Sequence, residues 1–347
     1  MNNSEIQIKQ SVRKAAGYPY LLVAWLAVLV LPGMVVADEL ANCMTELLEQ
    51  ASDSVTVGEL RTQCRQQMAD EVTPEQAIPA VVVDDRLKRD RENVLQPFTL
   101  MPHKPNYFLP VAYNYDGYDS GLFKQEFNDP SLNFDDTEAH FQISLKTPLG
   151  INILGAFDIY AAYTNRSFWQ VYNTDISSPF RETNPEPEAW IQFTPNWKIL
   201  GFRNQANAFG IVHQSNGRGG VLSRSWDRVY ANFVFTKGNF ALGFKPWIRI
   251  SEDADDDDNP DIADYLGHFE LRAGYKWNDQ VFSFMSRNNL ESGFKRGAIE
   301  FGWSFPLWKY PYLNGYLQYF TGYGESLIDY NHHVNRIGIG ISLTDWL

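Results

Sequence analysis

The feature that most restricts the fold is a series of segments, from about residue 106 onward, in which apolar and polar side chains alternate. Successive side chains of a strand point to opposite faces, so each segment predicts a β-strand with one apolar and one polar face. In one example, the apolar residues Phe269, Leu271, Ala273, Tyr275 and Trp277 alternate with Glu270, Arg272 and Lys276. About twelve strands are expected, an even number as in bacterial barrels. They lie near 106–114, 137–148, 153–172, 186–194, 198–213, 225–236, 239–251, 264–277, 280–290, 296–306, 311–322 and 333–343.

This alternation fits two architectures. A soluble β-sandwich buries its apolar faces between two sheets, whereas a transmembrane barrel turns them to lipid and keeps a polar lumen. Charged residues recur on the inner faces, and tryptophans near strand ends suggest an aromatic girdle: Trp169, Trp190, Trp197, Trp226, Trp247, Trp277 and Trp303. We therefore predict an all-β fold, a twelve-stranded antiparallel transmembrane β-barrel in the outer membrane.

The start of the chain has the pattern of a signal peptide. Lys9, Arg13 and Lys14 precede the apolar run Leu21–Leu31, and small residues follow up to Ala37. The run is shorter than the ~20 apolar residues of a membrane-spanning helix. We expect residues 1–37 to be removed on export, 38–104 to form a polar periplasmic segment with a short helical hairpin and a linker, and 105–347 to form the barrel domain.

The net charge of the chain narrows the classes of partner that it can bind. The net charge is −13, and removing residues 1–37, with three basic residues and one acidic residue, changes it to −15. Such a chain repels nucleic acid, so no nucleic-acid partner is expected.

In an oxidising compartment, Cys43 and Cys64 are predicted to form one disulfide.

The stretch IVHQSNGRGGVLSRSWDRVY, residues 211–230, places three reactive side chains on an apolar face. His213 and Ser215 share the face of Ile211, and Asp227 has the apolar parity of the next strand, which a hairpin would pair with the first. A carboxylate facing hydrocarbon costs about 2–4 kcal/mol near mid-membrane and less near the interface. One interpretation is therefore a solvated rim above the lipid, and the other is a catalytic triad.

The three residue types suit acyl transfer. His213 can take the proton of Ser215, and Asp227 can orient the imidazole and stabilise its charged form. The Asn216–Gly217 turn suits amides that point at an oxyanion. Because the triad is approached through lipid, the expected substrate is a phospholipid ester.

The same region resembles the active-site region of outer membrane phospholipase A. The matching residues are HxSNGR and SRSWxRxY at 213–218 and 223–230, SSPFRETN at 177–184, KPW at 245–247, DNPDI at 258–262 and GYGESLIDYN at 322–331. The resemblance covers about 106–347 and leaves out 38–104. It implies a twelve-stranded barrel, calcium-dependent hydrolysis of acyl esters at both glycerol positions, and activity as a homodimer.

The resemblance also assigns roles to further residues. It makes the Gly217 amide an oxyanion donor, and it makes the carbonyls of Arg218 and Ser223, with Ser177 of the partner subunit, the calcium ligands. Oxygen ligands and waters suffice for this hard cation. Asp258 matches an acid of a second calcium site found in the monomeric form of the family.

Two positions depart from the family pattern. Asp227 stands where the best-known members have Asn, and since Asp also accepts the imidazole hydrogen bond, we expect activity to be kept. Gly220 replaces the other carboxylate of the monomer calcium site, which leaves Asp258 as the matching acid.

Two further features of the sequence are a polar residue in an apolar stripe and a run of acidic residues. Asn165 is a polar residue in an apolar stripe and is expected at the dimer interface, because in lipid such a group seeks a partner. The acidic run 252–261 lacks EF-hand spacing and is expected mainly to be solvated, with weak metal binding, best at Asp258, as the alternative.

Two alternatives to a phospholipase stay open at this point. One is a passive pore or structural barrel, in which Glu270, Arg272, Lys276 and Glu300 point inward. The other is a hydrolase of a different acyl lipid.

Overall fold

The computed structural model describes residues 64, 83, 90, 100–288, 290–308 and 310–345. The chain divides into two compact units, Met1–Pro79 and Ala80–Leu347. In the first unit, Cys64 is buried in a helix and is disulfide-bonded. The other cysteine, Cys43, and the predicted signal peptide lie outside the described residues.

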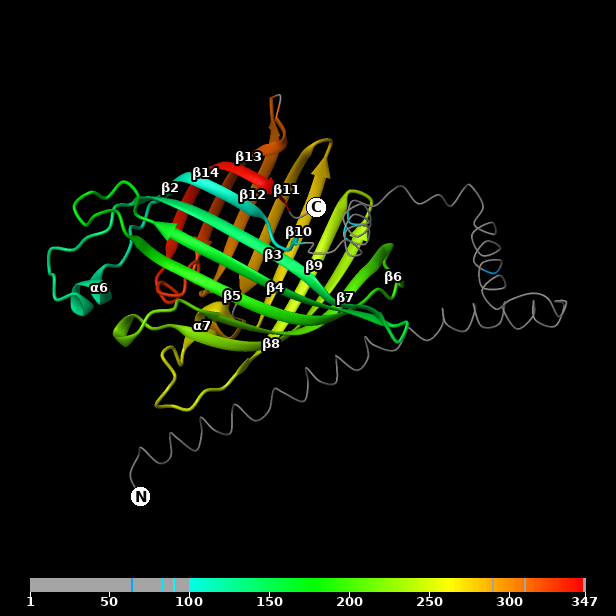
Figure 1. Ribbon diagram of the computed structural model, residues 1–347, viewed down its shortest axis with the longest axis horizontal. Coiled ribbons are helices and arrows are strands. Elements are labelled where there is room, and N and C mark those ends of the chain that lie inside the picture. The colour runs from blue at the N-terminus through cyan, green and yellow to red at the C-terminus, as the bar shows by residue number, and fades with distance from the viewer. Residues whose placement is uncertain are drawn as a thin grey trace, which may run out of the picture. The chain divides into compact units, whose positions relative to one another are not determined.

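The second unit is a closed antiparallel β-barrel (Figure 1). Its sheet has 14 strands, of which β1 and β6 are only 2 residues long, so twelve long strands form the wall. They are β2 (Asn106–Asn114), β3 (Thr137–Ile153), β4 (Phe157–Trp169), β5 (Phe180–Phe193), β7 (Phe202–Ser215), β8 (Ser225–Lys237), β9 (Phe240–Ile250), β10 (Phe269–Trp277), β11 (Gln280–Asn288), β12 (Gly297–Leu307), β13 (Tyr310–Gly322) and β14 (Val334–Thr344). The last strand, β14, pairs with the first, β2, which closes the ring and confirms the predicted barrel.

The two ends of the barrel differ in the length of their connections. Residues 115–136, 170–179, 216–224, 251–268 and 323–333 connect strands at one end, whereas residues 154–156, 238–239 and 278–279 connect them at the other. Outer membrane barrels have long loops outside the cell and short turns in the periplasm, so the long-loop end is the outer end.

Four short helices lie in the described connections: α6 (Gly121–Glu126), η3 (Gly220–Leu222), α7 (Ile262–Leu266) and η4 (Leu290–Ser292). The two short strands are β1 (Met101–Pro102), before β2, and β6 (Lys198–Ile199), between β5 and β7. Within the described residues, no helix is both long enough and apolar enough to cross a membrane.

The predicted alternation sets the two faces of the wall. Ile211 and Val229, paired across β7 and β8, are 59% and 48% exposed, while their neighbours Val212 and Tyr230 are buried inside. The outer face carries many other exposed apolar side chains, among them Ile248, Leu271, Phe301 and Ile339. Such a continuous apolar surface is suited to lipid rather than to water.

The predicted aromatic girdle is wrong for three tryptophans. Trp190, Trp226 and Trp247 are buried together in one interior cluster, whereas Trp277 and Trp303 are exposed on the outer face. The three buried residues have the inward parity of their strands, and parity decides the face even near a strand end. Inside, the indole of Trp226 donates to Gln214 and that of Trp247 to the carbonyl of Gly267, so burial leaves neither N–H without an acceptor.

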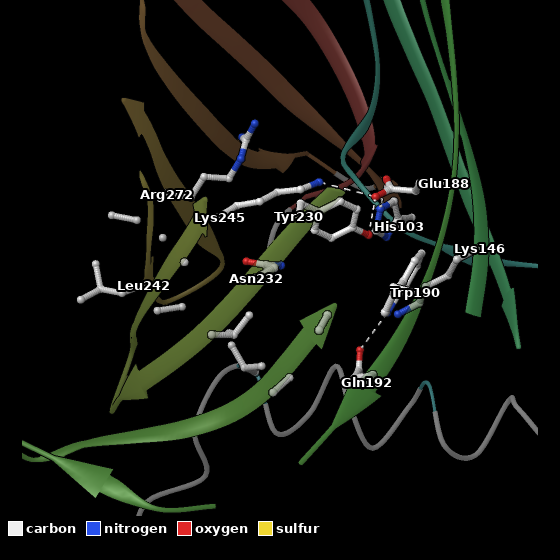
Figure 2. Close-up of a pocket in the computed structure, with 18 of the residues that line it drawn as sticks. His103, Lys146, Glu188, Trp190, Gln192, Tyr230, Asn232, Leu242, Lys245 and Arg272 are labelled. Carbon is white, nitrogen blue, oxygen red and sulfur yellow. Dashed lines mark hydrogen bonds and ion pairs between the residues drawn. The ribbon is translucent and has the colours of Figure 1, made fainter. Parts of the chain in front are cut away.

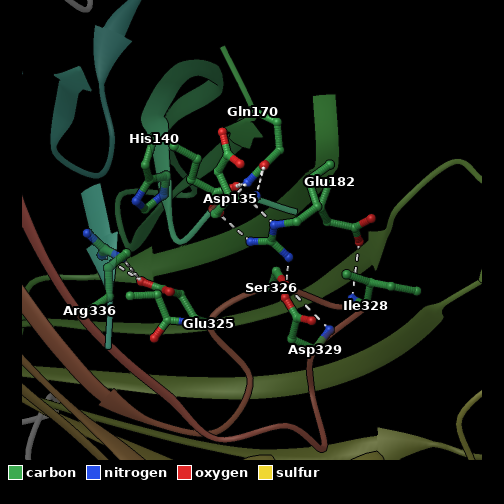
Figure 3. Close-up of polar contacts among 12 residues, drawn as sticks. Asp135, His140, Gln170, Glu182, Glu325, Ser326, Ile328, Asp329 and Arg336 are labelled. Atoms are coloured by element: carbon green, nitrogen blue, oxygen red, sulfur yellow. Dashed lines mark hydrogen bonds and ion pairs between the residues drawn. The ribbon is translucent and has the colours of Figure 1, made fainter. Parts of the chain in front are cut away.

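The outer half of the lumen is filled by a buried polar network. Arg181 makes two hydrogen bonds to Glu138, at 2.8 and 2.9 Å, and an ion pair with Asp329. Arg336 pairs with Glu325 at 2.6 Å, as Figure 3 shows. Glu325 and Asp329 belong to the β13–β14 loop, residues 323–333, which folds inward and is almost entirely buried between Gly324 and Tyr330.

The other half of the lumen holds a second cluster around Glu188 (Figure 2). Its carboxylate bonds to His103 at 2.7 Å, Tyr230 at 2.8 Å and Lys245 at 3.5 Å. A cavity of about 230 Å³ lies beside this cluster. Ion pairs and hydrogen bonds therefore occupy both halves of the lumen.

The start of the barrel domain stays a prediction. Asp90 pairs with Lys146 of β3 at 2.6 Å, and His103 contacts Glu188 of β5, although both Asp90 and His103 precede the predicted boundary at residue 105. Part of the segment 38–104 therefore contacts the barrel wall.

The buried network makes a testable prediction about stability. Arg181→Gln leaves the carboxylates of Glu138 and Asp329 without their cation and should lower the free energy of unfolding by about 3–5 kcal/mol. Urea unfolding in lipid, followed by tryptophan fluorescence, measures this. Lys198→Gln, at an exposed cation, is the control and should change stability by less than about 0.5 kcal/mol. Equal effects of the two variants would contradict the role given to Arg181.

Candidate active site

The predicted base and its orienting acid lie opposite each other on neighbouring strands. β7 and β8 pair in a register that sets His213 against Asp227 and Ser215 against Ser225. The imidazole Nδ1 and a carboxylate oxygen of Asp227 are 2.9 Å apart, a hydrogen bond in which the ring donates to the ionised acid. This bond leaves Nε2 as the ring atom that can act as a base.

Ser215 lies two residues beyond His213 on the same face of β7. Within the described part of the chain, its hydroxyl has no hydrogen bond to the imidazole. Catalytic hydrogen bonds are often long without substrate and tighten in the complex, so this geometry is compatible with proton transfer.

All three groups face outward. The side chains of His213 and Asp227 are 44% and 42% exposed, and they continue the outer stripe of Ile211 and Val229 toward the long-loop end. The intervening residue Trp226 points inward and is fully buried. The group is therefore accessible from the lipid-facing surface and not from the lumen.

The β7–β8 loop, residues 216–224, is organised by the buried Asn216. The amide of its side chain donates to the carbonyl of Leu222 at 2.8 Å, and its oxygen accepts from the backbone N–H groups of Arg218 and Arg224 at 3.2 and 3.1 Å. Gly217 follows with a φ of +63°, a conformation that favours glycine. This turn places the Gly217 amide directly after Ser215, where the sequence predicts an oxyanion donor.

Two of the predicted metal ligands lie together. The hydroxyl of Ser223 donates to the carboxylate of Asp258, which comes from the β9–β10 loop. The Ser223 carbonyl accepts from the Arg224 guanidinium at 2.5 Å, so a cation bound there would compete with this arginine. These groups, with the Arg218 carbonyl, are hard oxygen donors of the kind that calcium prefers.

Ser177 lies on a different loop. It is exposed in the β4–β5 connection with a φ of +64°, and the structure does not join it to Arg218 or Ser223 within one chain. Among the described residues, no group of three or more His, Cys, Asp or Glu side chains could hold a metal. A calcium site here would therefore depend on carbonyl and hydroxyl oxygens.

A carboxylate that the sequence did not point to lies beside Gly220. A Cβ placed on this glycine would lie 3.0 and 3.3 Å from the carboxylate oxygens of Glu126, the last residue of α6. An acidic side chain at 220 would therefore crowd Glu126. No local sequence signal links α6 to the β7–β8 loop, since their contact depends on how two separate loops fold.

The acidic run 252–261 is partly used in structural contacts. Asp257 pairs with Arg249 at 2.6 Å, and Asp261 accepts a hydrogen bond of 2.5 Å from Tyr330 of the inward-folded loop. Burial, and after it this hydrogen bond, raises the pKa of Tyr330, so the hydroxyl stays protonated and donates.

Asn165 lies on β4, on the parity of the exposed Tyr163, and its side-chain amide donates to Ser167 at 3.0 Å. Its placement on the apolar side of the wall agrees with the sequence pattern. Its role at a dimer interface stays a prediction.

Comparison with known proteins gives a consistent result. The family model described as Phospholipase A1 matches residues 83–343. Phospholipase A1 of Escherichia coli (strain K12) is 39% identical over 260 residues, which cover 73% of this chain and 86% of that protein. Phospholipase A1 of Klebsiella pneumoniae is 37% identical, with coverage of 75% and 86%.

Solved structures agree with the sequence comparisons. Outer membrane phospholipase A from Escherichia coli superposes with a TM-score of 0.66 at 37% identity, covering 72% of this chain and 100% of that one. A Salmonella typhi outer membrane phospholipase, solved as a dimer with bound calcium, gives 0.65 at 37% identity, with coverage of 72% and 94%. The chain described here belongs to the phospholipase A1 family of outer membrane β-barrel enzymes.

Proposed function

We propose that this enzyme hydrolyses acyl esters of phospholipids at both glycerol positions, and of lysophospholipids, with a Ser215–His213–Asp227 triad. The observation that carries the proposal is the outward-facing His213–Asp227 hydrogen bond beside Ser215, on the apolar surface of the barrel. A phospholipid in the outer leaflet can present its ester carbonyl to this point without leaving the membrane.

The proposed chemistry is acyl transfer to serine, then to water. Nε2 of His213 takes the Ser215 proton as the hydroxyl oxygen attacks the ester carbonyl, and the imidazolium then protonates the departing alcohol oxygen. Water repeats the sequence on the acyl-enzyme and releases a fatty acid. The Asp227 carboxylate holds the ring orientation and stabilises the imidazolium.

The oxyanion of each tetrahedral intermediate needs hydrogen-bond donors. The Gly217 amide follows the nucleophile on a turn fixed by Asn216, and it makes no hydrogen bond in the described part of the chain. A preorganised donor of this kind is typically worth a factor of about 10²–10³ in kcat.

Calcium is the proposed cofactor. The residues that would hold it are Arg218 and Ser223 through their carbonyls, Ser177 of the partner subunit, and, in a separate site, Asp258. Bound calcium would supply positive charge near the oxyanion. The solved dimer of the Salmonella typhi relative, with its bound calcium, supports both the metal and the homodimer. Asn165 is proposed to bond across the dimer interface within lipid.

Of the alternative functions, a conducting pore finds no support in the lumen, where Glu188, Arg181 and Arg336 are engaged in ion pairs. Hydrolysis of another acyl lipid uses the same groups and differs only in substrate.

The nucleophile gives the most direct test. Ser215→Ala should lower fatty-acid release from detergent-dispersed phospholipid at least about 10⁴-fold, because the acyl-enzyme cannot form. Ser225→Ala, at the cross-strand neighbour, is the matched control and should retain most activity. The barrel should stay folded in both, as judged by the mobility of unheated samples in SDS gels. Retained activity in Ser215→Ala would remove this residue from the mechanism.

The orienting acid gives a graded prediction. Asp227→Asn keeps an oxygen that can accept from Nδ1 and introduces the residue that the best-known family members have here, so it should retain activity, whereas Asp227→Ala loses the acceptor and should lose activity. Initial rates at saturating substrate compare the two variants. Equal rates for Asp227→Ala and the unaltered enzyme would show that the 2.9 Å contact has no catalytic role.

The metal is tested by removal and by one substitution. Chelation with EDTA should abolish fatty-acid release, and added calcium should restore it. Asp258→Asn should raise the calcium concentration that gives half-maximal binding, measured by titration calorimetry on the Ser215→Ala protein. Asp255→Asn, an exposed acid of the same loop, is the control. Full activity in EDTA would exclude calcium.

A further inference from the structure

Glu182 is a buried carboxylate whose two oxygens face two different loops. It lies near the start of β5 and is fully buried. One oxygen accepts from the backbone N–H of Ile328 at 3.2 Å (Figure 3). The same oxygen accepts from Asn184 at 2.7 Å. The other faces the side chains of Asn216 and Arg218, at 3.5 and 3.4 Å. The residue therefore links the inward-folded β13–β14 loop to the β7–β8 loop.

Other contacts hold the same two loops together. Leu222 of the β7–β8 loop packs against Ile328 and against Phe123 of α6 in one buried cluster. The Arg218 guanidinium also donates to the backbone carbonyls of Phe180 and Arg181, at 3.1 and 2.8 Å. Since a carboxyl group is costly to bury without hydrogen-bond partners, the position of Glu182 depends on these donors, and their positions depend on Glu182.

Two successive sets of contacts connect Glu182 to the groups that are proposed to react. Glu182 contacts the side chains of Asn216 and Arg218, and Asn216 in turn holds the backbone N–H groups of Arg218 and Arg224. The Gly217 amide lies in the chain between Asn216 and Arg218, and the Arg218 carbonyl belongs to the residue whose N–H Asn216 holds. Rotation of Asn216 would therefore turn the amide that is proposed to face the oxyanion.

We propose that Glu182 is a positioning residue: from inside the barrel it fixes the β7–β8 loop, and through Asn216 it sets the orientation of the Gly217 amide and the Arg218 carbonyl. The inference rests on the proposed roles of these two groups. It makes the inward-folded β13–β14 loop a support of an active site on the opposite face of the wall.

Glu182→Gln tests the proposal with little change of size. The amide oxygen can still accept from Ile328 and Asn184, while its NH₂ group would face the donors of Asn216 and Arg218. We expect kcat to fall about tenfold to a hundredfold, as for a small misplacement of a catalytic group, with KM for dispersed phospholipid changed much less. Glu182→Asp, which keeps the charge but shortens the side chain, is the second variant should the glutamine form fail to fold.

Glu188→Gln is the matched control. Glu188 is a buried carboxylate of the same strand, β5, and its partners His103, Tyr230 and Lys245 lie outside both the β13–β14 loop and the β7–β8 loop. It should lower stability and leave kcat within about twofold of the unaltered enzyme. If both variants lose kcat equally, loss of a buried charge explains the effect and the proposal is overturned.

A double-mutant cycle with Asn216→Ser separates positioning from general destabilisation. If Glu182 acts through Asn216, the fold loss of kcat in the double variant should be clearly smaller than the product of the fold losses in the two single variants. Independent effects would instead multiply. Unchanged kcat in Glu182→Gln, or losses that multiply, would overturn the proposal. Ser215→Ala, assayed in parallel, tests the triad separately, so either conclusion can fail alone.

Discussion

The alternation of side chains between the two faces of each strand is the constraint on which the rest of this structure depends. It turns Ile211 and Val229 toward lipid and Val212, Trp226 and Tyr230 toward the lumen. The same parity carries His213, Ser215 and Asp227 outward on β7 and β8. A shift of one residue in either strand would bury these three side chains in the barrel, where no membrane lipid could reach them.

The interior combines a cluster of buried aromatic side chains with ion pairs and hydrogen bonds. Arg181 and Arg336 each make several charged contacts, and the β13–β14 loop folds into the outer half of the lumen to complete them. Buried polar networks are costly when incomplete and rigid when satisfied. A rigid interior gives the outer surface a fixed support, on which the β7–β8 loop can keep its geometry.

The strands and the outward placement of His213 and Asp227 could be predicted from the sequence because both depend on local two-residue parity. The prediction of an aromatic girdle is wrong for Trp190, Trp226 and Trp247 because these residues have inward parity, although they lie toward strand ends. The sequence did not predict the inward fold of residues 323–333, the contacts of Glu182, or the place of Glu126 beside Gly220. These depend on loops distant in sequence meeting at the outer end, and neither periodicity nor spacing reports such contacts.

The orientation of the nucleophile can be measured directly with a nitroxide label on Ser215→Cys in lipid bilayers. Collision with oxygen, which concentrates in lipid, and with a water-soluble nickel chelate distinguishes the two faces, with Val229→Cys as the outward reference and Val212→Cys as the inward one. A label at 215 should resemble the one at 229, with oxygen access exceeding nickel access. Accessibility like that of the label at 212 would place the serine in the lumen and contradict catalysis at the lipid surface.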